Sequence, residues 1–363
     1  MKTKLSNLAR LFLIYGLMPL FCLIAAALLA LSDGGNVYSL RALALEYTAD
    51  SLVDSIVGDL SRAAADPPAV DAFAYAAPEA DPALGPSPAV EAPDFKTPVP
   101  DGMKPIVKRD LSGSSLFINT TKYSLDPAAL REASDLSPVS GSDPLVLVVH
   151  THGTEAFYRD GGWFDPDRPA DGWYDPHGES PRSSERSENV VGVGDEFCAV
   201  LEASGIPTLH CDVLHDVPDF NSSYSHSYAS VTSYLKKYPS IKYVVDIHRD
   251  SIIKDDGEKL RPFTVIDSLP CAQVMLVMGT DESGYSHPDW RVNMGNALLY
   301  KDTMDALYPG LARPIYVRTV RFNQHVATGA MLLEIGSCGN TFTEAKNAAH
   351  FAALALAALI RSA

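Results

Sequence analysis

Three short apolar runs of the chain lie next to, or contain, side chains that could act in catalysis or metal binding. His152 follows the first run, His248 ends the second, and Glu334 lies inside the third. Imidazole nitrogens and carboxylate oxygens are preferred zinc ligands, and a catalytic zinc keeps one position open for water. A carboxylate inside an apolar strand is costly unless it is paired or functional. The sequence therefore predicts a zinc site with His152 and His248 as ligands and Glu334 as general base.

A third zinc ligand is expected close to His152. Glu155 lies three residues further on, so one turn can present both side chains to a single ion. Zinc lowers the pKa of a bound water to about 7, so that Glu334 can accept its proton and pass it to a leaving amine. The predicted chemistry is hydrolysis in which water, rather than a side chain, is the nucleophile.

These residues need a scaffold that brings the ends of separate strands together. In open α/β sheets, ligands bind beyond the carboxyl ends of the strands. Short apolar runs alternate here with segments of helical spacing, which predicts a three-layer α/β sandwich: a central, mostly parallel sheet with helices on both faces. The expected strands are 145–150, 208–210, 243–247, 274–278, 315–320 and 331–335, and the expected helices are 190–203, 228–238, 290–307 and 341–360.

The N-terminal residues have the pattern of a membrane anchor. Residues 11–31 contain no charged side chain and form a run long enough for a helix to cross a bilayer. Lys2, Lys4 and Arg10 precede this run and favour a cytoplasmic N-terminus, so the rest of the chain is expected outside the cytoplasm. A cleaved signal peptide is the alternative, although its apolar part is usually shorter and ends at a small-residue cleavage site.

The remainder of the chain divides by composition. Residues 64–104 are rich in Pro, Ala and Asp and bury too little apolar surface to become ordered, which indicates an extended linker. The predicted parts are a cytoplasmic tip with a transmembrane anchor (1–32), a juxtamembrane helix (33–63), this linker (64–104), a connecting segment (105–142) and a catalytic domain (143–363).

Composition also excludes some classes of function. The net charge of −16 argues against a nucleic-acid partner, because phosphate backbones bind Lys- and Arg-rich surfaces. The five cysteines form no CxxC pair, so a cysteine-based zinc site is not expected. The chain has no HExxH, GxSxG or P-loop motif, which leaves the histidine and glutamate site as the centre of the predicted chemistry.

Several motifs resemble those of the stage II sporulation protein P family. They are HTHGTEAF, ENVVGVGDEF, HCDVLHD, VVDIHRDS, HPDWRVN, YPGLARPIYVRTVRFNQH and GAMLLEIGSCGNTFTEA, in this order over about residues 143–361. The resemblance implies a zinc N-acetylmuramoyl-L-alanine amidase-like enzyme that cleaves the amide between muramic acid and the stem peptide of peptidoglycan. It further implies cleavage of peptide crosslinks, a role at the septal wall during engulfment of a forespore, and partnership with a lytic transglycosylase and membrane scaffold proteins.

The resemblance also assigns roles to single residues. His152 and His248 match the metal histidines of the family, and Glu334 matches the catalytic glutamate. Ordinary zinc amidases of this fold take a further ligand from the start of the first helix, where Glu185 and Glu188 lie. We favour Glu155 over both, because it belongs to the HTHxxE run and has short spacing to His152.

Two residues are expected to bind the substrate. Arg249 and Asn340 follow strands of the metal site, and their side chains suit the carboxylates of a stem peptide. Alternatively, Arg249 pairs with Asp246 or Asp250 and has a structural role.

Two other functions fit the same residues. An H-x-x-E pair followed by a distant histidine also suits a zinc carboxypeptidase that trims stem peptides. A non-catalytic domain that binds peptidoglycan and recruits partners is the second alternative, and metal binding would separate it from the two enzymes.

Overall fold

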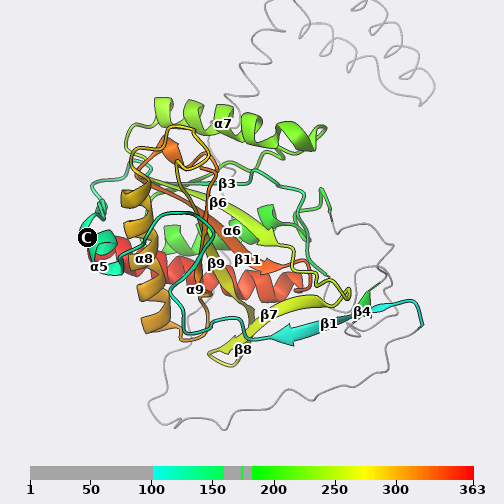
Figure 1. Ribbon diagram of the computed structural model, residues 1–363. Helices are drawn as coiled ribbons and strands as arrows, with labels where there is room; N and C mark the ends of the chain where they lie inside the picture. The colour runs from blue at the N-terminus through cyan, green and yellow to red at the C-terminus, as the bar shows by residue number, and fades with distance from the viewer. Residues whose placement is uncertain (1–100, 159–172, 175–181) are drawn as a thin grey trace, which may run out of the picture. The chain divides into compact units, whose positions relative to one another are not determined.

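The computed structural model describes residues 101–158, 173–174 and 182–363 of the chain (Figure 1). The predicted membrane anchor and juxtamembrane helix, and all but the end of the predicted linker, lie outside these residues. Within the described part of the chain, no helix has the length and apolar character needed to cross a membrane.

A seven-stranded sheet forms the centre of the fold, in the order β2-β10-β9-β11-β6-β3-β5. Neighbouring strands are parallel except β9 and β11, which are antiparallel, so the prediction of a mostly parallel sheet is confirmed. The strands are β2 (Phe117–Asn119), β3 (Val146–Val149), β5 (Thr208–His210), β6 (Tyr243–Asp250), β9 (Val274–Gly279), β10 (Ile315–Arg318) and β11 (Gly329–Ser337).

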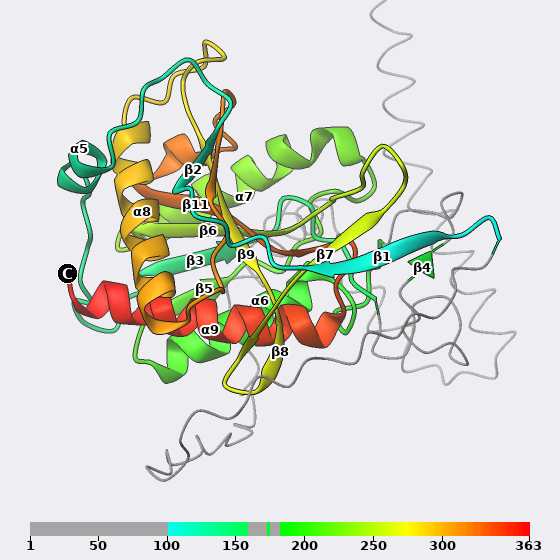
Figure 2. The same ribbon diagram turned by 60° about the horizontal axis from the view of Figure 1, so that its bottom comes forward.

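Helices cover both faces of this sheet, as Figures 1 and 2 show. Val146 and Val148 of β3 belong to the large core cluster shared with α6, α8 and α9. Leu147 and Val149 point to the opposite face, where they pack with Val231 of α7. The side chains thus alternate between two cores, as expected for a strand that is buried on both faces. The helices are α6 (Val190–Ala203), α7 (Ser223–Lys237), α8 (Trp290–Leu307) and α9 (Phe342–Arg361).

A second, four-stranded sheet lies in the order β4-β1-β7-β8, and the sequence did not predict it. Its strands carry charged or exposed residues at many positions, so they lack the continuous apolar runs that identify the central strands. The residues interpreted as a connecting segment also supply α5 (Pro127–Glu132), which packs on α8. The strands are β1 (Lys104–Arg109), β4 (Trp173–Tyr174), β7 (Lys259–Ile266) and β8 (Leu269–Ala272).

Gly295 allows α5 to approach α8 closely. A Cβ atom on this residue would lie 2.2 Å from the carbonyl oxygen of Leu130 and 3.0 Å from the backbone nitrogen of Ser134. Because both atoms belong to the backbone, the two helices would have to separate to admit a methyl group. We expect Gly295→Ala to lower the free energy of unfolding by about 1–3 kcal/mol, as overpacking usually does.

Urea unfolding followed by circular dichroism measures this change. Leu307→Ala on the same helix is the control, because Leu307 is 48% exposed and its loss should change stability by about 0.5 kcal/mol or less. Equal urea midpoints for Gly295→Ala and the wild type would contradict the close contact.

Candidate metal centre

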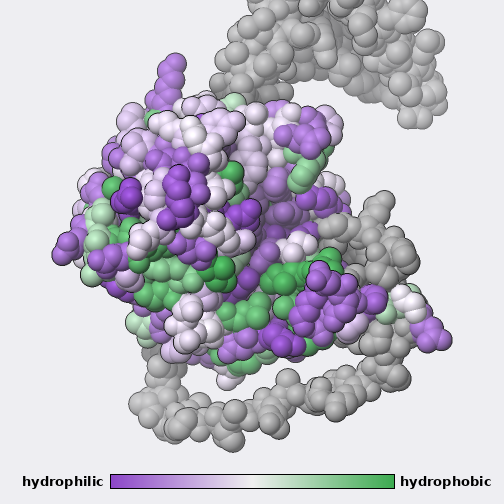
Figure 3. Space-filling model, viewed as in Figure 1, coloured by the Kyte–Doolittle hydropathy of each residue, from purple (hydrophilic) through white to green (hydrophobic). Residues whose placement is uncertain are grey.

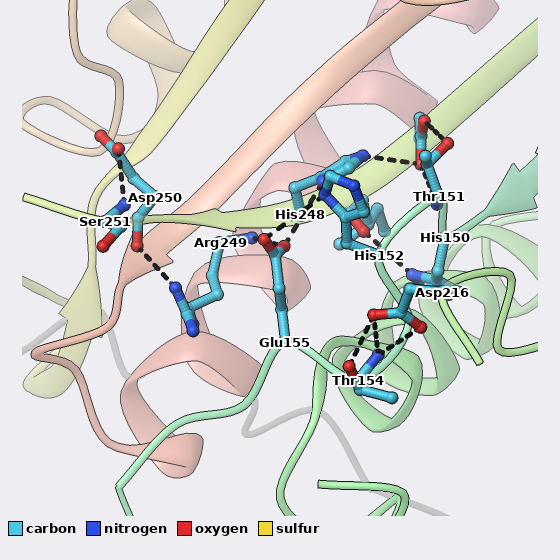
Figure 4. A network of polar contacts seen from close by, with 12 residues as sticks. His150, Thr151, His152, Thr154, Glu155, Asp216, His248, Arg249, Asp250 and Ser251 are labelled. Atoms are coloured by element: carbon cyan, nitrogen blue, oxygen red, sulfur yellow. Dashed lines mark hydrogen bonds and ion pairs between the residues drawn. The ribbon is translucent and has the colours of Figure 1, made fainter. Parts of the chain in front are cut away.

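The proposed zinc ligands and the proposed base converge at the carboxyl ends of β3, β6 and β11. The chain turns sharply after β3, and the backbone nitrogen of Glu155 donates a hydrogen bond of 3.0 Å to the carbonyl oxygen of His152. This turn presents both side chains toward β6, where His248 faces them (Figure 4). Glu334 of β11 pairs in register with His248, so the two side chains lie on the same face of the sheet.

The distances within this group fit a single metal ion. His152 Nδ1 lies 3.6 Å from Glu155 Oε1, and His248 Nδ1 lies 3.3 Å from Glu155 Oε2. Each residue offers one ligand atom, and these atoms all lie within 4.8 Å of one another. Ligands about 2.0–2.1 Å from one zinc ion are about 3.3–3.4 Å apart at the corners of a tetrahedron. The donor atoms and their spacing therefore suit zinc, with room for a fourth ligand.

Buried carboxylates favour a positive charge at this place. Burial opposes ionisation of Glu155, but hydrogen bonds with His152 and His248 hold the pKa of its carboxyl well below its usual range. Burial alone would lower the pKa of His248, but the charges of Asp246 and Glu155 hold it well above the usual value. A metal cation that binds His248 in place of its proton would be attracted by the same two carboxylates, those of Asp246 and Glu155.

Asp246 fixes the orientation of the His248 ring. Its Oδ1 atom lies 3.1 Å from His248 Nε2, on the side of the ring opposite Glu155. The same carboxylate accepts hydrogen bonds of 2.9 Å from the backbone nitrogen of Thr151 and 2.6 Å from its hydroxyl. The predicted site did not include Asp246, although the spacing of two residues within one strand places Asp246 and His248 on the same face.

We expect Asp246→Asn to weaken zinc binding by about 10–100-fold, as the loss of a carboxylate behind a metal histidine typically does. The neutral amide of asparagine no longer favours the His248 tautomer that carries its proton on Nε2. That tautomer leaves Nδ1 free to bind a metal. Competition with a coloured chelator measures the affinity. Asp302→Asn, which removes only a partly exposed ion pair with Arg131, is the control, and an unchanged affinity for Asp246→Asn would refute the positioning role.

Glu334 has the environment expected of a general base. Its side chain is half-buried, and no hydrogen-bond partner for Oε2 lies among the described residues. Burial, reinforced by the negative charge of Asp250, raises the pKa of Glu334 to about 8. A carboxyl group with a pKa near neutrality can both accept and return a proton during a reaction.

The other predicted site residues are held by contacts within the fold. Arg249 is buried, and its guanidinium donates hydrogen bonds to the carbonyl oxygens of Ala156 and Asp250. Asn340 is also buried, and its amide nitrogen bonds to the carbonyl oxygen of Pro262 and the carboxylate of Glu344. Arg249 thus links β6 to the segment after β3, and Asn340 links its own turn to β7 and α9. Their role in substrate binding stays a prediction.

The alternative zinc ligands do not belong to this group. Glu185 is exposed, whereas Glu188 is buried with its carboxylate 2.8 Å from the Ser183 hydroxyl. Among the described residues, the group with metal-ligand spacing consists of His152, Glu155 and His248. It contains neither Glu185 nor Glu188.

Aromatic side chains form a wall beside His152 that no sequence signal predicted. The ring of Phe220 stacks on the His152 ring at 4.6 Å between centroids, and Tyr224 meets the same ring edge-on at 5.6 Å. Phe220 is 47% exposed, so the wall faces solvent at the entrance to the site. In Figure 3, hydrophilic residues predominate around α7, apolar residues gather over β7 and β8, and a hydrophilic hollow lies between the two regions.

Comparisons with known proteins relate the chain to a family of sporulation proteins. The family model described as Stage II sporulation protein P (SpoIIP) matches residues 108–357. The Stage II sporulation protein P of Bacillus subtilis (strain 168) is 27% identical over 226 residues, which cover 59% of this chain and 50% of the relative. The chain thus spans about half the length of this curated relative.

The solved structures that match the chain are amidases, at low sequence identity and low TM-score. The CwlD amidase from Clostridioides difficile, solved in complex with the GerS lipoprotein, gives a TM-score of 0.36 at 8% identity and covers 61% of this chain and 100% of its own. Ami1 from Mycobacterium smegmatis gives a TM-score of 0.35 at 13% identity, and the match covers 62% of this chain and 100% of its own. AmiC2 of Nostoc punctiforme gives a TM-score of 0.33 at 12% identity, and the match covers 61% of this chain and 98% of its own.

Proposed function

Because the chain belongs to the stage II sporulation protein P family, we propose that it is a zinc-dependent cell-wall hydrolase of sporulation. Its proposed substrate is the amide that joins muramic acid to the stem peptide of peptidoglycan. The single observation that carries this proposal is the geometry of the site. His152, Glu155 and His248 form a group with zinc-ligand spacing, and Glu334 lies in register beside it.

His152, Glu155 and His248 would hold the zinc ion, with Asp246 behind His248. Zinc, when bound, acts as a Lewis acid toward the amide carbonyl and lowers the pKa of water. Glu334 accepts a proton from the attacking water, whose oxygen forms a bond with the carbonyl carbon. As the bond between carbon and nitrogen breaks, Glu334 returns the proton to the nitrogen. The products are a carboxylic acid on muramic acid, which ionises at neutral pH, and a stem peptide with a free N-terminal amine.

The proposal includes the location and the partners of the enzyme. Residues 11–31 would anchor the chain in the cell membrane by a single span, with the catalytic part outside the cytoplasm. At the septal wall it would act beside a lytic transglycosylase and membrane proteins of the engulfment machinery, and would also cut peptide crosslinks.

Mass spectrometry of digested sacculi tests the bond that is cut. The zinc-loaded full-length protein should release intact stem peptides that begin with a free L-alanine amine, and zinc removal by a chelator should abolish their release. A carboxypeptidase would instead release single D-amino acids and leave the stems on the glycan. A binding protein without activity would release neither product, and either of these results would overturn the amidase proposal.

A further inference from the structure

A buried carboxylate, that of Asp216, holds the turn that carries two of the proposed zinc ligands. Its Oδ2 atom accepts hydrogen bonds of 3.2 Å from the backbone nitrogen of Thr154 and 2.5 Å from the Thr154 hydroxyl, as Figure 4 shows. Thr154 lies between His152 and Glu155 in the sequence. Asp216 also accepts a hydrogen bond of 2.9 Å from Nη1 of Arg182, so an ion pair fixes the turn from outside.

The backbone of Arg182 lies beside the same turn. Arg182 forms an isolated antiparallel bridge with Glu155, and the next residue, Ser183, donates a backbone hydrogen bond of 2.9 Å to the Thr154 carbonyl oxygen. Nη1 of Arg182 donates a further hydrogen bond, of 3.0 Å, to the Thr154 hydroxyl. The residues around the arginine are thus bound to the turn that carries the ligands.

The guanidinium of Arg182 acts on both ligands of the turn, directly on one and through an aromatic ring on the other. Its Nη2 atom lies 4.0 Å from Oε1 of Glu155, the oxygen that is 3.6 Å from His152 Nδ1. Its Cζ atom lies 4.6 Å from the centre of the Phe220 ring, and this ring stacks on His152. Oε2 of Glu155 accepts a hydrogen bond of 3.1 Å from the backbone nitrogen of Arg249. The carboxylate is therefore held from two ends, by Arg249 at Oε2 and by Arg182 at Oε1.

We propose that Arg182 is a positioning residue, which holds the Glu155 carboxylate and the His152 ring at the separation that one zinc ion requires. This inference rests on the proposed function, because it concerns the metal centre of the proposed hydrolase. The planar guanidinium presents five N–H donors in a fixed arrangement, so it can contact two carboxylates and an aromatic face together. Lysine offers a single point charge and cannot make these contacts at once. Such support matters because a site must be held within about 0.5 Å of its productive geometry.

A purely structural role, in which Arg182 only neutralises the charge of Asp216, predicts a different result. The side chain of Asp216 is 1% exposed, and a buried carboxylate that loses its cation is destabilising. Any cation near Asp216 would meet that need, so Arg182→Lys would retain both stability and zinc binding. In the positioning role, Arg182→Lys retains stability alone.

Chelator competition with the full-length protein separates the two roles. We expect Arg182→Gln and Arg182→Lys each to weaken zinc binding by about 10-fold, the lower end of the usual effect of residues behind metal ligands. The visible absorption of the cobalt-substituted protein, which depends on the geometry of the ligands, should change in both variants. The urea midpoint should fall in Arg182→Gln and stay near the wild-type value in Arg182→Lys.

Arg131→Gln is the matched control. The Arg131 side chain is 37% exposed, against 35% for Arg182, and it pairs with Asp302, which is not part of the proposed centre. This variant should keep the zinc affinity and the cobalt spectrum of the wild type. Unchanged affinity and spectrum in both Arg182 variants would overturn the inference, and so would full retention of zinc binding in Arg182→Lys.

The failure of this inference can be told apart from the failure of the proposed function, because the metal measurements use no peptidoglycan. A wild type that binds zinc but releases no stem peptide would refute the proposed function, while the zinc affinities of the Arg182 variants would still decide the positioning role. A wild type with no affinity for zinc would refute both.

Discussion

Replacement of Glu334 by glutamine is expected to reduce kcat for stem-peptide release by about 10²–10⁴-fold, the usual contribution of a positioned general base. The amide cannot accept a proton from water, yet it has nearly the shape of the carboxyl group that it replaces. Glu334 is not part of the proposed ligand group, so the variant should retain the zinc content of the wild type. Turnover of a muramoyl tripeptide and metal analysis of the same preparation measure both quantities.

Glu196→Gln is a suitable control for this substitution. Glu196 belongs to α6, where it pairs with His350 and Lys346 of α9, and makes no contact with the proposed ligands. This variant should hydrolyse the peptide at the wild-type rate. A Glu334→Gln protein with full zinc content and full activity would remove Glu334 from the mechanism.

The same substitution should also stabilise the zinc-free protein, which gives a measurement independent of catalysis. The pKa of Glu334 is raised from 4.5 to about 8 on folding, so the folded state holds a proton that the unfolded state has released between these pH values. Stability therefore falls as the pH rises from about 4.5 to about 8, and stays low above that range. Glutamine has no proton to lose, so the gain in melting temperature from Glu334→Gln should grow across this pH window.

Substitution of His248 by alanine is the second change with a large expected effect. It removes one of the proposed ligands, and we expect zinc affinity to fall by more than about 10²-fold, beyond the loss typical of residues behind the ligands. It also leaves the buried carboxylates of Asp246 and Glu155 without the cationic ring between them. A broken buried ion pair costs about 3–5 kcal/mol, so the free energy of unfolding should fall as well.

Chelator competition and urea unfolding measure the two effects of His248→Ala separately. His226→Ala is the control, because His226 is an exposed residue of α7 whose ring nitrogen Nδ1 bonds to the carbonyl oxygen of His215. If His248→Ala binds zinc as tightly as the wild type, the ion is held elsewhere and the proposed centre is incorrect.

The sequence predicted all the central strands except β2, and the convergence of the site, because both depend on local patterns. A continuous apolar run indicates a strand buried on both faces, and β3, β6 and β11 each contain one. Parallel strands end at the same edge of a sheet, so His152, His248 and Glu334 could be placed together without knowledge of the strand order.

Features that depend on contacts between distant segments could not be predicted in this way. The antiparallel pairing of β9 with β11 cannot be recognised from the apolar run of either strand. The half-exposed β1 pairs with β7 more than a hundred residues away, and its own residues give no signal of that partner. Tyr224 follows Ser222 and Ser223 in a polar segment, and only the folding of α7 over the sheet brings it to His152.

The central position of β11 has a consequence for the synthesis of the chain. β11 lies between β9 and β6 in the sheet, yet it is the last strand in sequence. Until a ribosome has made residue 337, β6 and β9 expose unpaired edges to each other, and long-range pairing must wait. Glu334 belongs to β11, so the complete sheet and the proposed base form together, late in the synthesis of the chain. A nascent or prematurely terminated chain that lacks β11 would therefore carry the proposed metal ligands but lack the proposed base.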